Sequence, residues 1–96
     1  MKEVLKHDVP IIRMLEAYEG VGKDLVYKEE LKDIKEDELV DLFGYQENDP
    51  LFYDLYEVNS SNYVFFQKKV TRKIELDKYL YVIACYQAPN LGQACA

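Results

Sequence analysis

Side chains that usually carry enzyme chemistry are scarce in this sequence. Its 96 residues include a single histidine, His7, two cysteines and no tryptophan. A Cys–His or Ser–His couple would require His7, which lies close to the N-terminus, to be held firmly against a nucleophile. We therefore interpret His7 as a solvated side chain, and we predict that the protein is not an enzyme.

Sequence motifs for metal ions and cofactors are also missing. The chain contains no CxxC, no paired histidines and no D-x-D-x-D-G loop, which are the usual signatures of zinc and calcium sites. The glycines of EGVGKD (19–24) lack the spacing and the Lys-Ser/Thr ending of a phosphate-binding loop, so this segment is typical of a chain reversal. We expect neither a metal site nor a cofactor.

Long hydrophobic runs do not occur. No stretch approaches the roughly 18 consecutive apolar residues of a membrane span, and the N-terminal MKEVLKHDVP has no apolar signal-peptide segment. A disulfide between Cys85 and Cys95 would have to recruit the end of the chain. We therefore interpret Cys85 as a small buried hydrophobe and Cys95 as a free thiol. These features predict a cytoplasmic location.

The remaining composition is that of a folded domain. Hydrophobic residues make up 49% of the chain and charged residues 31%, which argues against global disorder. A length of 96 residues corresponds to one domain, which spans 1–96. We place its folded core at residues 10–87, and we interpret residues 88–96, which are small and weakly patterned, as a loosely ordered tail.

Four segments have the composition of β-strands. Residues 11–18 (IIRMLEAY) and 25–34 (LVYKEELKDI) flank the predicted reversal, which favours a β-hairpin, although 25–34 is also compatible with a helix. Residues 78–87 (KYLYVIACYQ) are apolar on both faces of the pleat, so we predict a central strand there. Residues 55–58 (LYEV) have strand-like composition as well.

The clearest helical signal lies at residues 33–44. Apolar side chains recur there at i, i+3 and i+4: Leu39, Leu42 and Phe43. Asp33 with Glu36 is the expected capping pair at the start of this helix. Gly44 stands where a left-handed residue is needed to end it.

Two shorter helices are expected further along the chain. Asp49 as an N-cap and Pro50 at the first helical position predict a short helix. Residues 62–70 fit either a helix or a strand, and we favour a helix capped by Ser60 or Ser61. Together these elements predict an α+β fold, in which two or three helices pack on an antiparallel sheet of three or four strands.

Charge is unevenly distributed along the chain, whose net charge is −6. Residues 16–57 hold fourteen acids and four lysines, whereas residues 58–96 hold five basic residues and two acids. A surface dominated by carboxylates disfavours direct binding to nucleic acid, because affinity for phosphates depends on cations that release counterions. It favours a cationic protein partner, because a surface patch with charges of one sign can accelerate association by about 10–1000-fold.

Carboxylates and aromatic residues of this middle segment are the candidate binding groups. The predicted helix carries carboxylates on its polar side: Glu36, Asp37, Glu38 and Asp41. A solvated face or a partner surface is favoured for them over catalysis, which needs a cleft and perturbed pKa values. Four aromatic residues flank the loop that follows: Tyr45, Phe52, Tyr53 and Tyr56. These four side chains could equally belong to the core or to an exposed binding patch, and we expect Tyr53 to point outward most.

The pattern of residues 33–58 and 74–86 resembles a kind of small bacterial protein. It consists of an acidic helix, Leu-Phe-Gly, Asp-Pro, Tyr-x-x-Tyr-x-Val, and then Leu-Asp-x-Tyr leading into a C-terminal strand. Several small acidic proteins of this sort look like the immunity proteins of contact-dependent growth-inhibition and polymorphic toxin systems. The resemblance covers about residues 11–87, and its motifs are structural, so it carries over no fixed binding residues.

This resemblance implies a protein that binds and neutralises a cognate toxin, which would be a cationic domain of nuclease type. Carboxylates would take the place of phosphates in the toxin's cleft: Glu36, Asp37, Asp41, Glu47, Asp49, Asp54 and Glu57. Tyr53 or Tyr56 would serve as a hydrophobic anchor. The alternative is a small cytoplasmic regulatory or adaptor domain that binds proteins without a toxin partner. The oligomeric state is left open, including a homodimer formed through a sheet edge.

Overall fold

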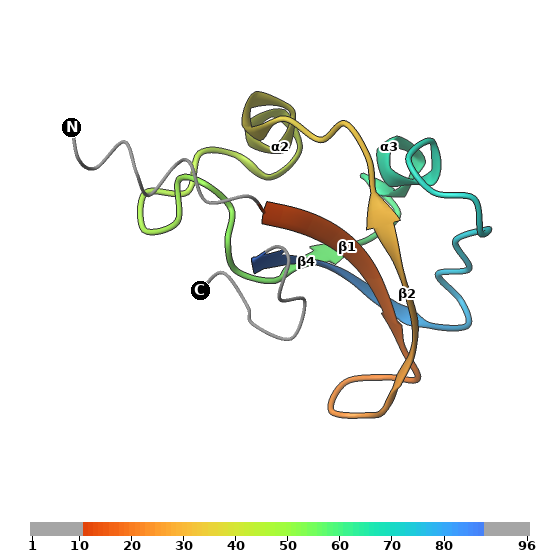
Figure 1. The fold of residues 1–96 in the computed structure, drawn as a ribbon. Coiled ribbons are helices and arrows are strands. Elements are labelled where there is room, and N and C mark those ends of the chain that lie inside the picture. Colours follow the sequence, from red (N-terminus) through yellow and green to blue (C-terminus); the bar gives the residue numbers. More distant parts are fainter. Residues whose placement is uncertain (1–10, 88–96) are drawn as a thin grey trace.

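A four-stranded antiparallel sheet carries two helices on one of its faces (Figure 1). The computed structural model describes residues 11–87. The elements follow in the order β1 (Ile11–Tyr18), β2 (Leu25–Leu31), α2 (Glu36–Phe43), β3 (Tyr56–Val58), α3 (Tyr63–Gln67) and β4 (Leu80–Gln87). This arrangement confirms the predicted α+β class. His7, Cys95 and the expected tail at 88–96 lie outside the described residues.

The strands lie in the order β2-β1-β4-β3, and neighbouring strands are antiparallel throughout. β1 and β2 form the predicted hairpin, so the strand alternative for 25–34 is correct, although the strand ends at Leu31. In the reversal between them, the Lys23 N–H donates to Gly20 O at 3.0 Å. Gly22 adopts a φ of +70°, which glycine tolerates without strain. β4 lies between two other strands, which confirms the prediction of a central strand.

Alternation along the strands separates the two faces of the sheet. Leu15 and Ala17 of β1, with Tyr81 and Ile83 of β4, are at most 2% exposed and face the layer of α2 and α3. α2 and α3 contribute Leu39 and Phe66 to this core, and the loop that precedes β3 contributes Phe52. Cys85 is buried as expected, but it is disulfide-bonded, so its interpretation as simply a small buried hydrophobe is incomplete.

α2 begins later than its sequence signals predicted. Asp33 adopts a φ of +58°, which lies outside the helical region, so the helix starts at Glu36 with Lys35 as its N-cap. The capping side chain is Glu38, whose Oε1 accepts the Lys35 N–H at 3.0 Å. The expected pairing of Asp33 with Glu36 is therefore wrong. Gly44 has the expected positive φ of +83°, although its ψ of 160° lies outside the left-handed helical region.

α3 confirms the helical alternative for 62–70, but it covers only five of those residues. Asn62 is the N-cap residue, and its Oδ1 accepts the Asn59 N–H at 2.8 Å. Because this amide closes the turn before the helix, the expected cap at Ser60 or Ser61 is wrong.

Candidate protein-binding surface

The acidic loop between α2 and β3, residues 44–55, is held to the sheet by a buried arginine. Arg13 of β1 is 7% exposed; its Nη1 donates to Phe52 O at 2.6 Å and its Nη2 to Leu51 O at 2.8 Å. Glu36 Oε2 lies 4.0 Å from Nη2. Burial lowers the pKa of Arg13, while Glu36 and other negative groups oppose that shift. An arginine nevertheless stays protonated in proteins, so the two loop carbonyls have a permanently charged donor.

Asp49 organises the rest of this loop. Its Oδ1 accepts the Tyr53 N–H at 2.9 Å, and its Oδ2 accepts the Asp54 N–H at 3.0 Å and the Tyr56 hydroxyl at 2.6 Å. Burial alone would raise the pKa of Asp49, but the hydrogen bonds from Tyr56, Tyr53 and Asp54 outweigh it and lower the pKa. The Asp49 carboxylate therefore forms hydrogen bonds within the loop and does not project from the surface.

The short helix predicted from Asp49 and Pro50 does not form. One turn is closed by the Phe52 N–H, which donates to Asp49 O at 3.0 Å, and Phe52 then adopts a φ of +57°. A positive φ at a bulky side chain ends any helix. Here it accompanies complete burial of the Phe52 ring, 6.3 Å from the ring of Phe43 on α2. Within residues 11–87 the sheet therefore carries two helices and not three.

The four aromatic residues around the loop divide between core and surface. Phe52 is fully buried, and the centre of its ring lies 5.1 Å from that of Tyr56, which is half-buried. Tyr53 is also half-buried, whereas Tyr45 is 69% exposed. The expectation that Tyr53 points outward most is therefore wrong. The chain turns away from the core at Gly44, immediately after α2, and Tyr45 follows this turn outward.

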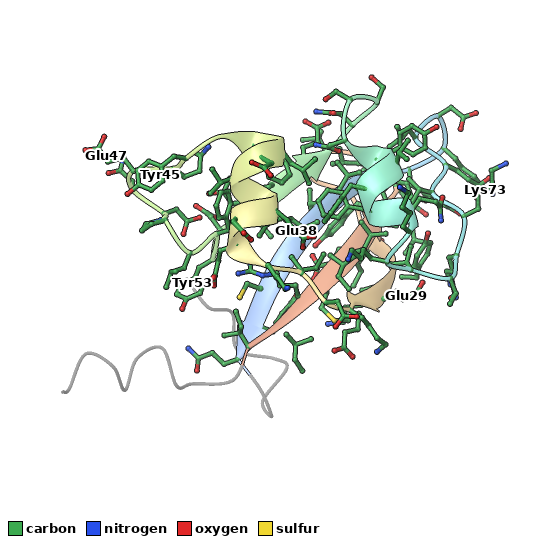
Figure 2. The ribbon with its side chains drawn as sticks, turned by 90° about the horizontal axis from the view of Figure 1, so that it is seen from above. Glu29, Glu38, Tyr45, Glu47, Tyr53 and Lys73 are labelled. Carbon is green, nitrogen blue, oxygen red and sulfur yellow. The ribbon has the colours of Figure 1, made fainter. Side chains whose placement is uncertain are left out.

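Exposed carboxylates lie on α2 and on the loop that carries Tyr45. Asp37 and Asp41 are four residues apart and share one face of α2, and Glu47 is exposed on the loop. These three side chains accept no hydrogen bond and form no ion pair within residues 11–87. Figure 2 shows Tyr45 and Glu47 at the end opposite Lys73. We call Asp37, Asp41, Tyr45 and Glu47 the acidic end.

Other predicted contact residues lie toward the opposite face of the sheet. Tyr56 and Val58 of β3 face the core, so alternation turns Glu57 to the side away from the helices. Tyr53 and Asp54 line a cavity that also includes residues of β1 and β4 on that side. The predicted set therefore wraps around the β3 edge of the sheet.

Three members of the predicted set have internal roles. Glu36 is exposed, but it lies beside Arg13 at the start of α2. Asp49 and Tyr56 hydrogen-bond to one another inside the loop. Burial and the contact with Asp49 raise the pKa of Tyr56, so its hydroxyl remains a donor at neutral pH.

Basic residues gather in the segment that follows α3. We call five of them the basic end: Lys68, Lys69, Arg72, Lys73 and Lys78. Glu29 of β2 ties this segment to the sheet, because its Oε2 accepts the Thr71 N–H and the Thr71 hydroxyl, both at 2.8 Å. Burial alone would raise the pKa of Glu29, but the hydrogen bonds from residues 71 and 72 lower it. Glu29 and Lys73 lie on the side away from Glu47 (Figure 2).

Sequence reasoning missed two charged residues of β1, Arg13 and Glu16, which are 7% and 2% exposed. Both stand in the otherwise apolar segment IIRMLEAY. A charge inside a buried strand requires polar partners, and this requirement was the available signal. It could not identify the partners Leu51, Phe52 and Tyr86, which lie at distant positions in the chain.

Two further kinds of site are absent from the described part of the chain. Within residues 11–87, no group of three or more His, Cys, Asp or Glu side chains is arranged to hold a metal ion. In the same range, neither helix has the length and apolar character needed to cross a membrane.

Comparison with known proteins places the chain among protein families. The family model described as Domain of unknown function (DUF7683) matches residues 12–84, from β1 into β4. No curated protein and no solved structure matches the chain. The matched range includes both the acidic end and the basic end.

Proposed function

Because the chain belongs to the family described as Domain of unknown function (DUF7683), which assigns no activity, we propose a function from its surface. The protein is an immunity protein that binds and neutralises a cognate toxin, a cationic domain of nuclease type. The acidic end makes the contact. One observation carries this proposal: exposed carboxylates without partners in the described chain lie on α2 and on the loop after it, which carries the exposed Tyr45.

The electrostatics of the acidic end suit a cationic protein. Charges of one sign at one end attract a partner of opposite charge to that end and accelerate association. Residues 36–57 strengthen this field because they include eight acids and no lysine or arginine. Tyr45 adds a large contact area at low entropic cost.

Neutralisation would follow from competition for the same cations. A nuclease binds phosphates through basic side chains in its cleft, and carboxylates that occupy those side chains exclude the nucleic acid. Arg13 and Asp49 hold the loop of the acidic end in one conformation. A preorganised loop loses little conformational entropy when it binds.

The test uses the product of the gene immediately upstream as the candidate toxin. Association is measured by stopped flow at low and at physiological ionic strength. The double variant Asp37→Lys/Asp41→Lys should slow association by about 10-fold or more at low salt and weaken its salt dependence. The matched control is Asp24→Lys/Asp77→Lys, which changes net charge equally at exposed positions outside the acidic end.

Three outcomes are informative. If no complex forms at micromolar concentration and the protein gives cells no protection from that product, the proposal is wrong. Equal slowing in both double variants would place the interface elsewhere, because net charge alone would then explain the rates. A complex without protection would favour the alternative of a regulatory or adaptor domain.

A further inference from the structure

Glu16 of β1 lies on the face of the sheet opposite the helices. It is 2% exposed, and the Tyr18 hydroxyl donates to its Oε1 at 2.7 Å. The Tyr86 hydroxyl of β4 donates to its Oε2. Each carboxylate oxygen has two lone pairs, so these bonds leave acceptor capacity at both oxygens.

A cavity of about 290 Å³ opens beside these three side chains. Residues that precede β3 form one of its walls: Tyr53, Asp54 and Leu55. Ala84 and Cys85 of β4 complete the lining. This volume is at the small end of the range for ligand pockets, so it suits one side chain better than a larger molecule.

Glu16 forms no direct ion pair within the described part of the chain. The ion pairs found within residues 11–87 involve other carboxylates. Lys28 faces Glu16 across β1 and β2, but its Nζ lies over the ring of Tyr86, 4.7 Å from the ring centre. Buried charges in proteins are normally paired. Within the described residues, Glu16 therefore has a neighbouring lysine but no direct cationic partner.

The walls of the cavity are chemically suited to a cation. Tyr18, Tyr53 and Tyr86 are among the residues that line it, and tyrosine rings attract cations within about 6 Å of their centres. The hydrogen bond to Glu16 raises the pKa of Tyr18 to about 12, so this phenol stays a neutral donor at physiological pH. Asp54 is exposed and adds a second carboxylate to the lining.

We propose that this cavity receives one arginine or lysine side chain of the protein partner. The inference rests on the proposed function, whose cationic partner supplies the side chain, and it identifies an anchoring contact. Residues 44–55 connect the two surfaces, because they run from the end of α2 to the wall of the cavity. The acidic end then determines how fast the partner associates, and the cavity determines how long it stays bound.

The first experiment needs no partner. N-acetyl-arginine amide, N-acetyl-lysine amide and neutral N-acetyl-norleucine amide are titrated into the protein while backbone amide shifts are recorded by NMR. We expect saturable shifts at Glu16, Ala84 and Tyr86 with a cationic probe, at dissociation constants of millimolar order, and none with norleucine. Comparison of the two cationic probes identifies the preferred head group. Equal shifts with the neutral probe, or no saturable shifts with either cation, would overturn the proposal.

Two substitutions separate a role in binding from a role in folding. Asp54→Asn retains the oxygen that accepts the Leu55 N–H and removes only the charge of an exposed side chain. It should weaken binding of the cationic probe by about 3–10-fold, whereas the matched control Asp77→Asn should leave binding unchanged. Glu16→Gln should abolish binding, and a thermal unfolding curve shows whether that variant is folded. Unchanged binding in Asp54→Asn and in folded Glu16→Gln would refute the assignment.

The partner complex distinguishes this inference from the proposed function. Asp54→Asn should raise the dissociation rate by about 3–10-fold with little change in the association rate. If the complex forms, its dissociation is unchanged and no cationic probe binds, the cavity assignment is wrong and the role of the acidic end stands. If no complex forms but the cationic probes bind, the proposed function is wrong and the cavity remains a cation site.

Discussion

The acidic end and the basic end use their charges in opposite ways. At the basic end, cations lie over aromatic rings of the fold. Arg72 Cζ is 4.0 Å from the centre of the Tyr27 ring, and Lys78 Nζ is 5.3 Å from the centre of the Tyr79 ring. At the acidic end, the carboxylates have no comparable contact within residues 11–87. Three cations of the basic end therefore contact rings of the protein itself, whereas the carboxylates of the acidic end remain available to a partner.

This difference separates charges that support the fold from charges that face outward. The Tyr27 hydroxyl lies 3.1 Å from that of Tyr81, a fully buried core residue, so the cation of Arg72 covers an extension of the core. Cation–π contacts at exposed positions contribute about 0.5–1 kcal/mol. Substitution of a basic residue that lies over a ring should therefore change stability, whereas substitutions at the acidic end should change association.

The largest effect is expected when the support beneath the acidic end is removed. Arg13→Met leaves the carbonyls of Leu51 and Phe52 without their charged donors, and such hydrogen bonds contribute about 1.5–3 kcal/mol each. We expect the free energy of unfolding in urea to fall by about 3 kcal/mol or more. Arg13→Lys keeps the charge but loses the forked donor geometry, so its loss should be intermediate. A loss below about 1 kcal/mol in Arg13→Met would contradict the role assigned to this residue.

The loop that carries Tyr45 and the segment after α3 are each held by one carboxylate whose pKa is lowered by hydrogen bonds, Asp49 and Glu29 respectively. A lowered folded-state pKa gives stability that is complete above the unfolded pKa, about 4, and is lost as pH falls through the folded value. We expect unfolding in urea to become easier below about pH 4, and this acid loss to be shallower in Asp49→Asn and Glu29→Gln. At neutral pH, each variant should be less stable by about 1–2 kcal/mol. An acid profile identical to that of the unsubstituted protein would show that the carboxylate does not stabilise the fold.

Much of the fold was predictable because its signals are local. The hairpin follows from two glycines between apolar segments, α2 from the spacing of Leu39, Leu42 and Phe43, and central β4 from an apolar run. The prediction of a third helix was wrong because the carboxylate of its apparent N-cap, Asp49, holds a loop together instead. A capping residue and a loop-closing residue have the same sequence signature, and only the tertiary contacts with distant side chains distinguish them.

The candidate surface was predictable in its chemistry and not in its geometry. Composition located the acidic segment, but the outward residue is Tyr45 and not Tyr53. The choice depends on the positive φ angles at Gly44 and Phe52 and on the donors of Arg13. These constraints act across about forty positions of the chain, so no local pattern encodes which tyrosine is exposed.

A moderate effect on stability is expected at the basic end. Arg72→Ala removes the guanidinium that covers Tyr27 and should lower the free energy of unfolding by about 0.5–1 kcal/mol. The control is Lys73→Ala, because Lys73 is exposed and makes no hydrogen bond, ion pair or ring contact within the described residues. Neither variant should alter the association rate with the partner by more than about 2-fold. Slower association in Arg72→Ala would mean that the basic end also contributes to binding.

The smallest effect on stability is expected for Tyr45→Ser. Tyr45 is 69% exposed, so its replacement should change the free energy of unfolding by no more than about 0.5 kcal/mol. The matched control is Val64→Ser, which removes another exposed apolar side chain, 54% accessible on α3. Only Tyr45→Ser should weaken partner binding, by about 10-fold, because aromatic residues at interface centres contribute most of the affinity. If Tyr45→Ser instead lowers stability by more than about 1 kcal/mol, Tyr45 belongs to the fold, and the contrast between the two ends no longer holds.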